Sequence, residues 1–350
     1  MTFIDIVKVF SLGSLTFVFG TIVSPLLLKF LAKMGMGKKI REESVAPIFA
    51  SMHKAKSGTL TGGGILIWGM AVLVILVIAF LSKFTDIKIF RELNFLSRSQ
   101  TWLPLGALIG AALVGLVDDY INVKGLIPKV GGITVKWKLL IYIAIALVAA
   151  LWFFLKLGFD TIHIPFIGDY SIGLFYIPFF IFIVVSTTFA VNEIDGLDGL
   201  AGGTIFPALL AYAVIALVQG KTDLATFLLV IIGGLLAFLW INIPPAKAFM
   251  GDTGAVALGI TLGVVAMLTN YSFLLPIIGF VFVVDTGSVI VQKIYKKIYK
   301  KKLFLSSPIH HHFQAKGMAE HTITMKFWII SWLCSIIGLV VFLLDRMATK

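Results

Sequence analysis

The chain has 350 residues, of which 59% are hydrophobic and only 13% are charged, and its mean hydropathy is +1.04. This composition leaves too little polar surface for a soluble protein of that length, so a lipid bilayer is the expected solvent. The formal charge of +12 does not indicate a nucleic-acid partner, because the Lys and Arg residues separate apolar runs and form no groove-reading motif. The single cysteine, Cys334, excludes disulfide bonds within the chain and a cysteine-based zinc site.

Apolar runs long enough to cross a bilayer recur along the chain. A membrane-spanning helix needs about 20 mostly apolar residues, because hydrocarbon offers no partner to an unpaired backbone group. The predicted spans are 9–32, 60–82, 103–120, 138–157, 172–191, 201–219, 225–243, 254–270, 272–292 and 326–345. The sequence therefore predicts an all-α, polytopic membrane protein of about ten transmembrane helices, with residues 1–350 forming a single integral membrane domain.

Loop charge predicts the orientation of these spans. Lys and Arg are concentrated in the loops that follow odd-numbered spans, and such loops face the cytoplasm. We therefore expect both termini to be extracytoplasmic. The predicted cytoplasmic loops are about 33–60, 119–138, 192–202, 243–254 and 293–325. On the opposite side, residues 163–172 alternate polar and apolar side chains around Gly168-Asp169, which predicts a small β-hairpin.

Acidic residues are scarce, and a group of them falls at the predicted cytoplasmic boundary. These are Asp118, Asp119, Asp195, Asp198 and Asp252. A carboxylate near hydrocarbon costs a few kcal/mol unless it is paired or hydrated, so several at one level indicate a shared cation. Carboxylates in short glycine-rich turns suit Mg²⁺, which takes oxygen ligands and keeps waters or substrate phosphates. The alternative is that each acid caps a helix end or pairs with a loop lysine.

Glycines and histidines at the same boundary suggest an anionic ligand. Glycine-rich stretches at 62–64, 196–203 and 251–254 precede or open predicted helices, where bare backbone amides favour anions. The run His310–His312 follows a lysine triplet in the last cytoplasmic loop. Three consecutive histidines cannot all point one way, so this run alone is not expected to bind zinc. Its imidazoles could donate hydrogen bonds to phosphate oxygens, or could have a purely structural role.

Five ordered motifs together resemble a known enzyme family. They are His53-Lys-Ala-Lys56-Ser-Gly-Thr-Leu-Thr61-Gly-Gly, Asp118-Asp119-Tyr120, Asn192-Glu-Ile-Asp195-Gly-Leu-Asp198-Gly-Leu, Asn242-Ile-Pro-Pro-Ala-Lys-Ala-Phe249-Met-Gly-Asp252 and Pro308-Ile-His-His-His-Phe313. Their order and loops are similar to those of the polyprenyl-phosphate N-acetylhexosamine-1-phosphate transferases. The last motif resembles the branch of that family that transfers phospho-MurNAc-pentapeptide. The resemblance extends from Lys54 to about Lys316.

The resemblance implies a reaction in the bacterial plasma (inner) membrane. Undecaprenyl phosphate would attack the β-phosphate of UDP-MurNAc-pentapeptide with Mg²⁺ as cofactor, giving lipid I for peptidoglycan synthesis and releasing UMP. Phosphoryl transfer mostly needs positioning and charge neutralisation, which a metal and cationic donors supply. The sequence leaves open whether the chain forms a homodimer.

The resemblance also implies roles for individual residues. The expected metal ligands are Asp252 and Asp195, whereas Asp118 and Asp119 would handle the lipid phosphate. The full expected catalytic set is Asp118, Asp119, Asp195, Asp252, His310, His311 and His312. The expected substrate-binding set is Lys56, Thr61, Asn192, Gly196, Leu197, Asp198, Asn242 and Phe249, with Phe249 stacking on the uracil base.

The chain departs from the family pattern mainly in its loop lysines. Where the family usually has a lysine two residues after the Asp-Asp-Tyr motif, this chain has Asn122, so Lys124 is the expected substitute. At the position of a second expected lysine this chain has Gly131, so Lys129 or Lys136 is expected to supply the positive charge.

Two other functions stay open. A relative that transfers GlcNAc-1-phosphate shares the aspartate motifs, and buried acids with glycine-broken helices also mark secondary transporters.

Overall fold

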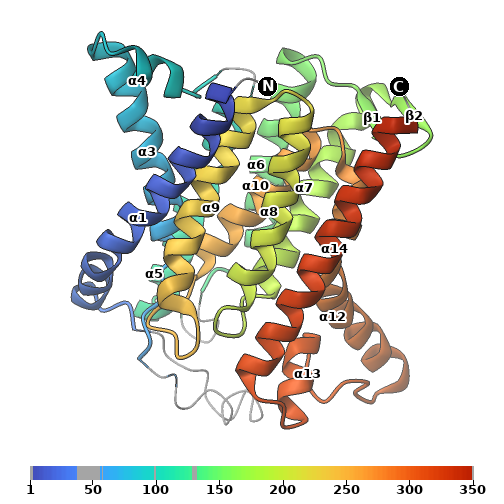
Figure 1. Cartoon of the computed structure of the whole chain (residues 1–350). Coiled ribbons are helices and arrows are strands. Elements are labelled where there is room, and N and C mark those ends of the chain that lie inside the picture. Colours follow the sequence, from blue (N-terminus) through green and yellow to red (C-terminus); the bar gives the residue numbers. More distant parts are fainter. Residues whose placement is uncertain (1–2, 38–55, 57, 98–99, 128–131, 349–350) are drawn as a thin grey trace.

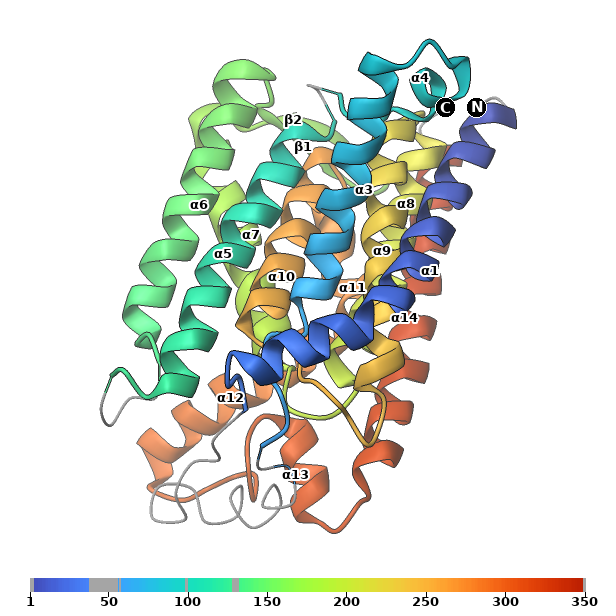
Figure 2. The same cartoon turned by 90° about the vertical axis from the view of Figure 1, so that its left-hand side faces the viewer.

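The computed structural model describes residues 3–37, 56, 58–97, 100–127 and 132–348. Within this part the chain forms a bundle of long helices with one small antiparallel sheet (Figures 1 and 2). The predicted site segment around His53 and Lys54, most of the 33–60 loop and Lys129 lie outside the described residues.

In the described part of the chain, ten long helices correspond to the ten predicted spans. They are α1 (Phe3–Lys33), α3 (Ile65–Phe84), α5 (Trp102–Lys124), α6 (Val135–Lys156), α7 (Tyr176–Glu193), α8 (Leu200–Val218), α9 (Thr222–Asn242), α10 (Asp252–Leu268), α12 (Phe280–Tyr299) and α14 (Glu320–Ala348). The shorter elements are α4 (Lys88–Leu93), β1 (Thr161–Ile164), β2 (Gly168–Ser171), η2 (Gly173–Phe175), η3 (Ser272–Leu274), α11 (Leu275–Ile278) and α13 (Ile309–Ala315).

Length and apolar composition confirm the prediction of a polytopic, all-α membrane protein. In the described part of the chain, eight helices could each cross a membrane, and one bent pair raises the number to nine. That pair corrects the predicted span 272–292, because its two halves, Ser272–Ile278 and Phe280–Tyr299, meet at an angle of 80°. Both views show α12 leaving the bundle at an angle, beside α13 (Figures 1 and 2).

The predicted span 254–270 is the central helix α10, which is 17 residues long. At about 1.5 Å per residue it extends roughly 25 Å, which is shorter than an ordinary span. Every residue from Thr253 to Leu268 is buried, so α10 lies among other helices instead of facing lipid. Glycines allow this close packing: a Cβ at Gly259 would lie 2.7 Å from the Cα of Thr188 on α7.

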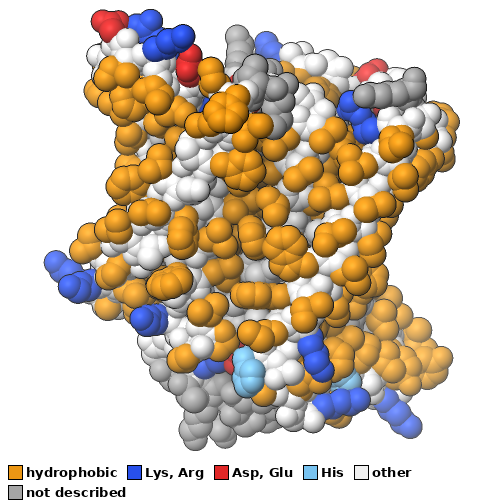
Figure 3. All heavy atoms as spheres, in the orientation of Figure 1, with side chains coloured by type: hydrophobic (Ala, Val, Ile, Leu, Met, Phe, Trp, Pro, Cys, Tyr) orange, Lys and Arg blue, Asp and Glu red, His pale blue; other side chains and the backbone are white. Residues whose placement is uncertain are grey.

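The outer surface of the bundle matches a membrane environment. Hydrophobic side chains cover the middle of the face in Figure 3, and charged side chains gather toward its two ends. Many apolar side chains of the bundle are largely exposed, as with Ile22 at 64%, Phe182 at 65% and Ile329 at 68%. Exposed apolar surface on this scale is stable only against lipid or a partner. The protein is therefore a multi-pass membrane protein.

The two ends of the bundle differ in character. The first residues of α10 and the last turns of α5 lie at one end, here called the carboxylate end because it holds Asp118, Asp119 and Asp252. The other end, here called the hairpin end, carries β1 and β2. Figure 1 shows both termini at the hairpin end and α13 at the carboxylate end.

The predicted β-hairpin is confirmed, but its turn lies earlier than expected. Thr161 pairs with Ser171 and Ile164 with Gly168, so residues 165–167 make the turn. Gly168-Asp169, the expected centre, instead begins the second strand. The turn includes Phe166 at a positive φ of 65°, an uncommon conformation for a bulky residue that pattern alone did not indicate.

Buried polar groups fasten the hairpin to the end of α14. The Asp345 carboxylate is fully buried and accepts hydrogen bonds from the Phe166 amide at 2.7 Å and the Tyr271 hydroxyl at 2.7 Å. Its Oδ2 also lies 2.8 Å from His163 Nε2, while His163 Nδ1 lies 2.7 Å from Asp169. Burial and the hydrogen bond to Asp345 raise the pKa of Tyr271, so its hydroxyl stays a donor.

Asp345→Ala is expected to destabilise the protein by about 3 kcal/mol, because it leaves several buried donors without their acceptor. A lowered Tm of the purified protein in detergent would measure this loss. The matched control is Asp160→Ala, which removes only an exposed hydrogen bond from the Ser171 hydroxyl. Equal Tm values for the two variants would contradict the role assigned to Asp345.

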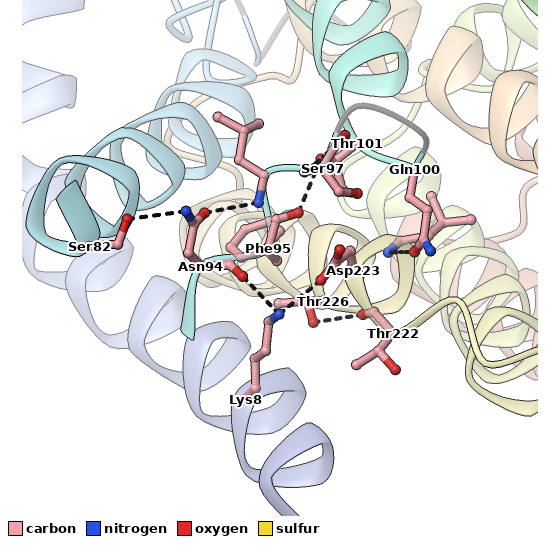
Figure 4. Close-up of polar contacts among 12 residues, drawn as sticks. Lys8, Ser82, Asn94, Phe95, Ser97, Gln100, Thr101, Thr222, Asp223 and Thr226 are labelled. Carbon is pink, nitrogen blue, oxygen red and sulfur yellow. Dashed lines mark hydrogen bonds and ion pairs between the residues drawn. The ribbon is translucent and has the colours of Figure 1, made fainter. Parts of the chain in front are cut away.

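A second polar cluster ties α1 to α9 at the hairpin end (Figure 4). The Lys8 ammonium group is buried and bonds to Asp223 Oδ1 at 2.8 Å and to the Asn94 carbonyl at 3.0 Å. Thr101 closes the adjoining turn, because its hydroxyl accepts from the Ser97 amide at 2.7 Å. These contacts satisfy polar groups that α1 could not bury alone.

Candidate active site

The carboxylate end is organised by Asp119, which caps the start of α10. Its Oδ1 accepts from the Asp252 amide at 3.0 Å and its Oδ2 from the Thr253 amide at 3.1 Å. The first amides of a helix have no partner within the helix, so a buried carboxylate is well placed there. Close packing makes the contact possible: a Cβ at Gly115, one turn earlier on α5, would lie 2.3 Å from the Asp252 carbonyl oxygen.

Lys138 joins the two neighbouring carboxylates. Its ammonium group lies 2.7 Å from Asp118 Oδ2 and also bonds to Asp252 Oδ2. Asp118 accepts a second hydrogen bond from the Ile133 amide, and Asp252 Oδ1 accepts from the Asn192 amide group at 3.1 Å. Lys138 is the fourth residue of α6 and its side chain is 20% exposed, so the ion pairs are only partly solvated.

A small cavity of about 80 Å³ opens between these groups. It is lined by Thr61, Asp119, Asn122, Val123, Asn192, Asp195, Gly251 and Asp252. Its polar side chains are carboxylates, amides and a hydroxyl, which are the hard oxygen donors that Mg²⁺ takes. Within the described residues, no group of three or more His, Cys, Asp or Glu side chains is already spaced to hold a metal ion. The donor chemistry therefore fits Mg²⁺ bound by few protein ligands, with the remaining positions left to water or phosphate.

A second group of predicted residues surrounds Lys56. Its ammonium group lies 2.6 Å from Asp198 Oδ1 and 5.8 Å from the centre of the Phe249 ring, and it also bonds to Glu320. Glu320 accepts from the Asp198 amide at 2.7 Å, and Asp198 Oδ2 accepts from the Ala246 amide at 3.0 Å. The Lys56 ammonium group thus contacts residues from the segments before α8 and α10 and from the start of α14.

Asn242 holds the turn that carries Asp198. Its side-chain oxygen accepts from the Gly199 amide at 3.0 Å, and its amide group donates to the Ala248 carbonyl at 2.8 Å. Gly199 caps α8 with a φ of +74°, a conformation that favours glycine. Leu197 beside it is buried, with 4% exposure. Asn242 therefore joins the turn before α8 to the loop before α10.

The three histidine side chains do not all point the same way, as expected for consecutive residues of one helix. His310 and His311 are buried side by side with ring centres 4.2 Å apart, and a Cβ at Gly196 would lie 2.4 Å and 3.0 Å from their Nε2 atoms. His312 lies elsewhere, because its Nδ1 accepts from the Leu305 amide at 3.1 Å and its ring packs on Phe304. Burial and nearby Lys316 lower the pKa of His312, consistent with a neutral, accepting imidazole.

Among the described residues, the lysine that bridges the carboxylates is Lys138, which the sequence analysis did not single out. Lys124 donates to the Met34 carbonyl at 2.8 Å, and Lys136 is exposed, whereas Lys138 takes the bridging position. A helix turns about 100° per residue, so Lys124 lies about 140° around α5 from Asp119. Asn122 lines the small cavity at the position where a lysine was expected.

Three charged residues at this end were missed by the sequence analysis: Lys138, Asp285 and Glu320. Asp285 interrupts an apolar run, and an ionisable residue inside a membrane helix is a functional candidate by default, so that signal could have found it. Lys138 stands at the start of a predicted span, two residues after Lys136, where loop lysines are ordinary. Glu320 carried no such signal, because it lies in an ordinary polar loop before the last span.

Comparison with known proteins identifies the class to which this fold and site belong. Residues 101–270 match the family model described as glycosyl transferase family 4. This segment runs from α5 to the end of α10, so it contains the aspartates Asp118, Asp119, Asp195 and Asp252.

Whole-chain relatives narrow the class further. The chain is 38% identical over 327 residues to the phospho-N-acetylmuramoyl-pentapeptide-transferase of a Geobacillus species, strain WCH70, covering 93% of this chain and 95% of the relative. It is 36% identical over 357 residues to the protein of the same name from Bartonella quintana (97% and 93% covered) and 35% identical over 348 residues to that from Chloroflexus aurantiacus (96% and 89%). The chain belongs to the phospho-N-acetylmuramoyl-pentapeptide-transferase family.

Proposed function

We propose that the protein transfers phospho-MurNAc-pentapeptide from UDP-MurNAc-pentapeptide to undecaprenyl phosphate, producing lipid I and UMP. The observation that carries this proposal is the convergence of carboxylates from α5, the turn after α7 and the start of α10 on one small cavity, in a chain of this family. The cavity lies at the end of an apolar bundle, where a lipid phosphate and a water-soluble nucleotide can meet.

The chain's own groups position and neutralise the reacting phosphates. A phosphate that is already ionised at neutral pH scarcely needs a strong base, so we favour direct attack by the lipid phosphate over a covalent phospho-enzyme. Asp118 is held by Lys138 and the Ile133 amide beside the cavity, where it can orient the acceptor. The Lys138 ammonium group, which bonds to Asp118 and Asp252, would balance part of the charge of the bound phosphates.

Magnesium is part of the proposal. Asp252 and Asp195 line the cavity with neutral oxygen donors around them, and we assign the ion to these two carboxylates. Bound there, Mg²⁺ would neutralise phosphate charge as a Lewis acid. We assign Asp119 to the helix cap instead, because its two oxygens accept from the first backbone amides of α10.

The Lys56 group is the proposed nucleotide pocket, and we assign the carboxylate end to the cytoplasm. The family resemblance puts the nucleotide on Lys56, Asp198, Asn242 and Phe249, which the structure brings into one neighbourhood. The excess of Lys and Arg in the loops at this end supports a cytoplasmic location. UDP-sugars are available on that side, and both termini would then be extracytoplasmic.

A direct assay tests the function. Purified protein in detergent is incubated with Mg²⁺, undecaprenyl phosphate and either UDP-MurNAc-pentapeptide or UDP-GlcNAc, and UMP and the lipid product are measured. Consumption of the pentapeptide donor alone is expected. Consumption of UDP-GlcNAc alone would identify a GlcNAc-1-phosphate transferase instead, and UMP release without any gradient would exclude transport as the primary activity.

Lys56→Met is expected to raise KM for the nucleotide donor about tenfold, because it removes the cation and leaves Asp198 facing Glu320. KM for undecaprenyl phosphate should change little, since its proposed site lies around Asp118. Steady-state kinetics with each substrate varied in turn distinguishes the two. The matched control is Lys247→Met, a lysine in the loop before α10 for which the described residues show no ion pair. A larger effect on the lipid than on the nucleotide would move the pocket elsewhere.

A further inference from the structure

Asp285 and His310 form a fully buried pair near the proposed site. Asp285 lies on α12 and His310 on α13, and neither side chain has any exposed surface. His310 Nδ1 lies 2.8 Å from Asp285 Oδ1, and the His310 amide also points to that oxygen at 3.4 Å. A buried carboxylate is costly unless it is paired, and its partner here is a single imidazole.

The contact leaves the other ring nitrogen of His310 without a protein partner. Within the described residues, Nε2 is buried and makes no hydrogen bond. It faces the turn between α7 and α8, where a Cβ at Gly196 would lie only 2.4 Å away. Glycine is therefore required at 196 to let the imidazole approach the backbone. Asp195, the proposed metal ligand, is the preceding residue.

We propose that Asp285 is a positioning residue of the transferase site, resting on the function proposed above. Its carboxylate accepts a hydrogen bond from Nδ1–H, which holds His310 in one tautomer and directs Nε2 to the Gly196 turn, next to Asp195. A carboxylate that accepts from one imidazole nitrogen determines which nitrogen is left for the ligand. Asp285 itself does not touch the substrate.

A purely structural pair would show the same burial, so the test measures the tautomer of His310 directly. Protein labelled with ¹⁵N-histidine in detergent is examined by NMR, with the His310 signals assigned by their absence in His310→Gln. The native protein should show His310 protonated at Nδ1, and Asp285→Asn should change that pattern. The control is Thr286→Val, which removes a neighbouring hydroxyl that has no partner in the described structure. An Nδ1–H pattern that persists in Asp285→Asn would overturn the proposal.

Kinetics then tests whether the pair serves catalysis. Asp285→Asn is expected to lower kcat about 10- to 100-fold with a smaller change in KM, as for other residues that orient a histidine from behind. In the His310→Ala background, Asp285→Asn should have no further effect on kcat. A further loss of the same size there would show that Asp285 acts independently of His310 and would overturn the proposal.

Two more variants cover a failure of Asp285→Asn to fold. Asp285→Glu keeps the carboxylate, so it should preserve the Nδ1–H tautomer and retain more activity than Asp285→Ala. An Nε2–H tautomer in Asp285→Glu would contradict the assignment. Because the NMR result does not require turnover, an inactive native protein would refute the proposed function without deciding the role of Asp285.

Discussion

Asp252→Asn is expected to lower kcat at least about 100-fold while leaving the bundle folded. Asparagine keeps the size of the side chain and an oxygen that can accept from Asn192. It removes the charge that attracts Lys138 and the proposed Mg²⁺. Initial rates of UMP release, measured across a Mg²⁺ titration, would show the loss, and excess Mg²⁺ should not restore it.

The control for that experiment is Asp86→Asn. Asp86 is a fully exposed carboxylate near the hairpin end whose partner is Arg91 on the surface. Its replacement should leave the rate and the dependence on Mg²⁺ unchanged. Full, Mg²⁺-dependent turnover by Asp252→Asn would mean that Asp252 is not a metal ligand, and the proposed metal site would have to be abandoned.

Lys138→Met is expected to destabilise the protein by about 3 kcal/mol in the absence of divalent cations, because Asp118 and Asp252 lose their shared counter-charge. Methionine retains most of the length of the side chain, so packing should change little. Added Mg²⁺ should raise the Tm of this variant more than that of the native protein, since the ion would replace the missing positive charge.

Lys136→Met is the matched control for this second prediction. It removes the same charge two residues earlier on the same helix, from an exposed position. Its Tm should match that of the native protein with and without Mg²⁺. A Lys138→Met variant that is fully stable in the presence of a chelator would show that Asp118 and Asp252 need no shared counter-charge, which would contradict the role assigned to Lys138.

Hydropathy predicted the helices well because membrane insertion depends on local composition. The exceptions are informative. Residues 272–292 are apolar enough on average to predict one span, yet the chain bends by 80° at Gly279, because hydropathy records how apolar a segment is and not its direction. The central helix α10 has the composition of a span but only 17 residues. It can be this short because it is buried among other helices and does not face lipid.

The sequence predicted which motifs form the candidate site, but not which side chains within it bond to one another. The aspartates could be grouped because alternate loops of a membrane protein return to the same side. Lys138 and Asp252 are separated by 114 positions, and Glu320 and Asp198 by 122. No local pattern relates residues at such distances, so the lysine roles were assigned by proximity in sequence, to Lys124 and to Lys129 or Lys136.

The amino-acid sequence by itself determined the class of protein, the level of the acidic residues in the membrane and the family resemblance, because these depend on composition and short motifs. Tertiary structure alone decided which charge each acid meets. Gly115 lets α5 approach the start of α10, so Asp119 becomes a helix cap while Asp118 turns to Lys138. Two adjacent aspartates thus acquire different partners, because helix packing determines which groups lie within hydrogen-bonding distance.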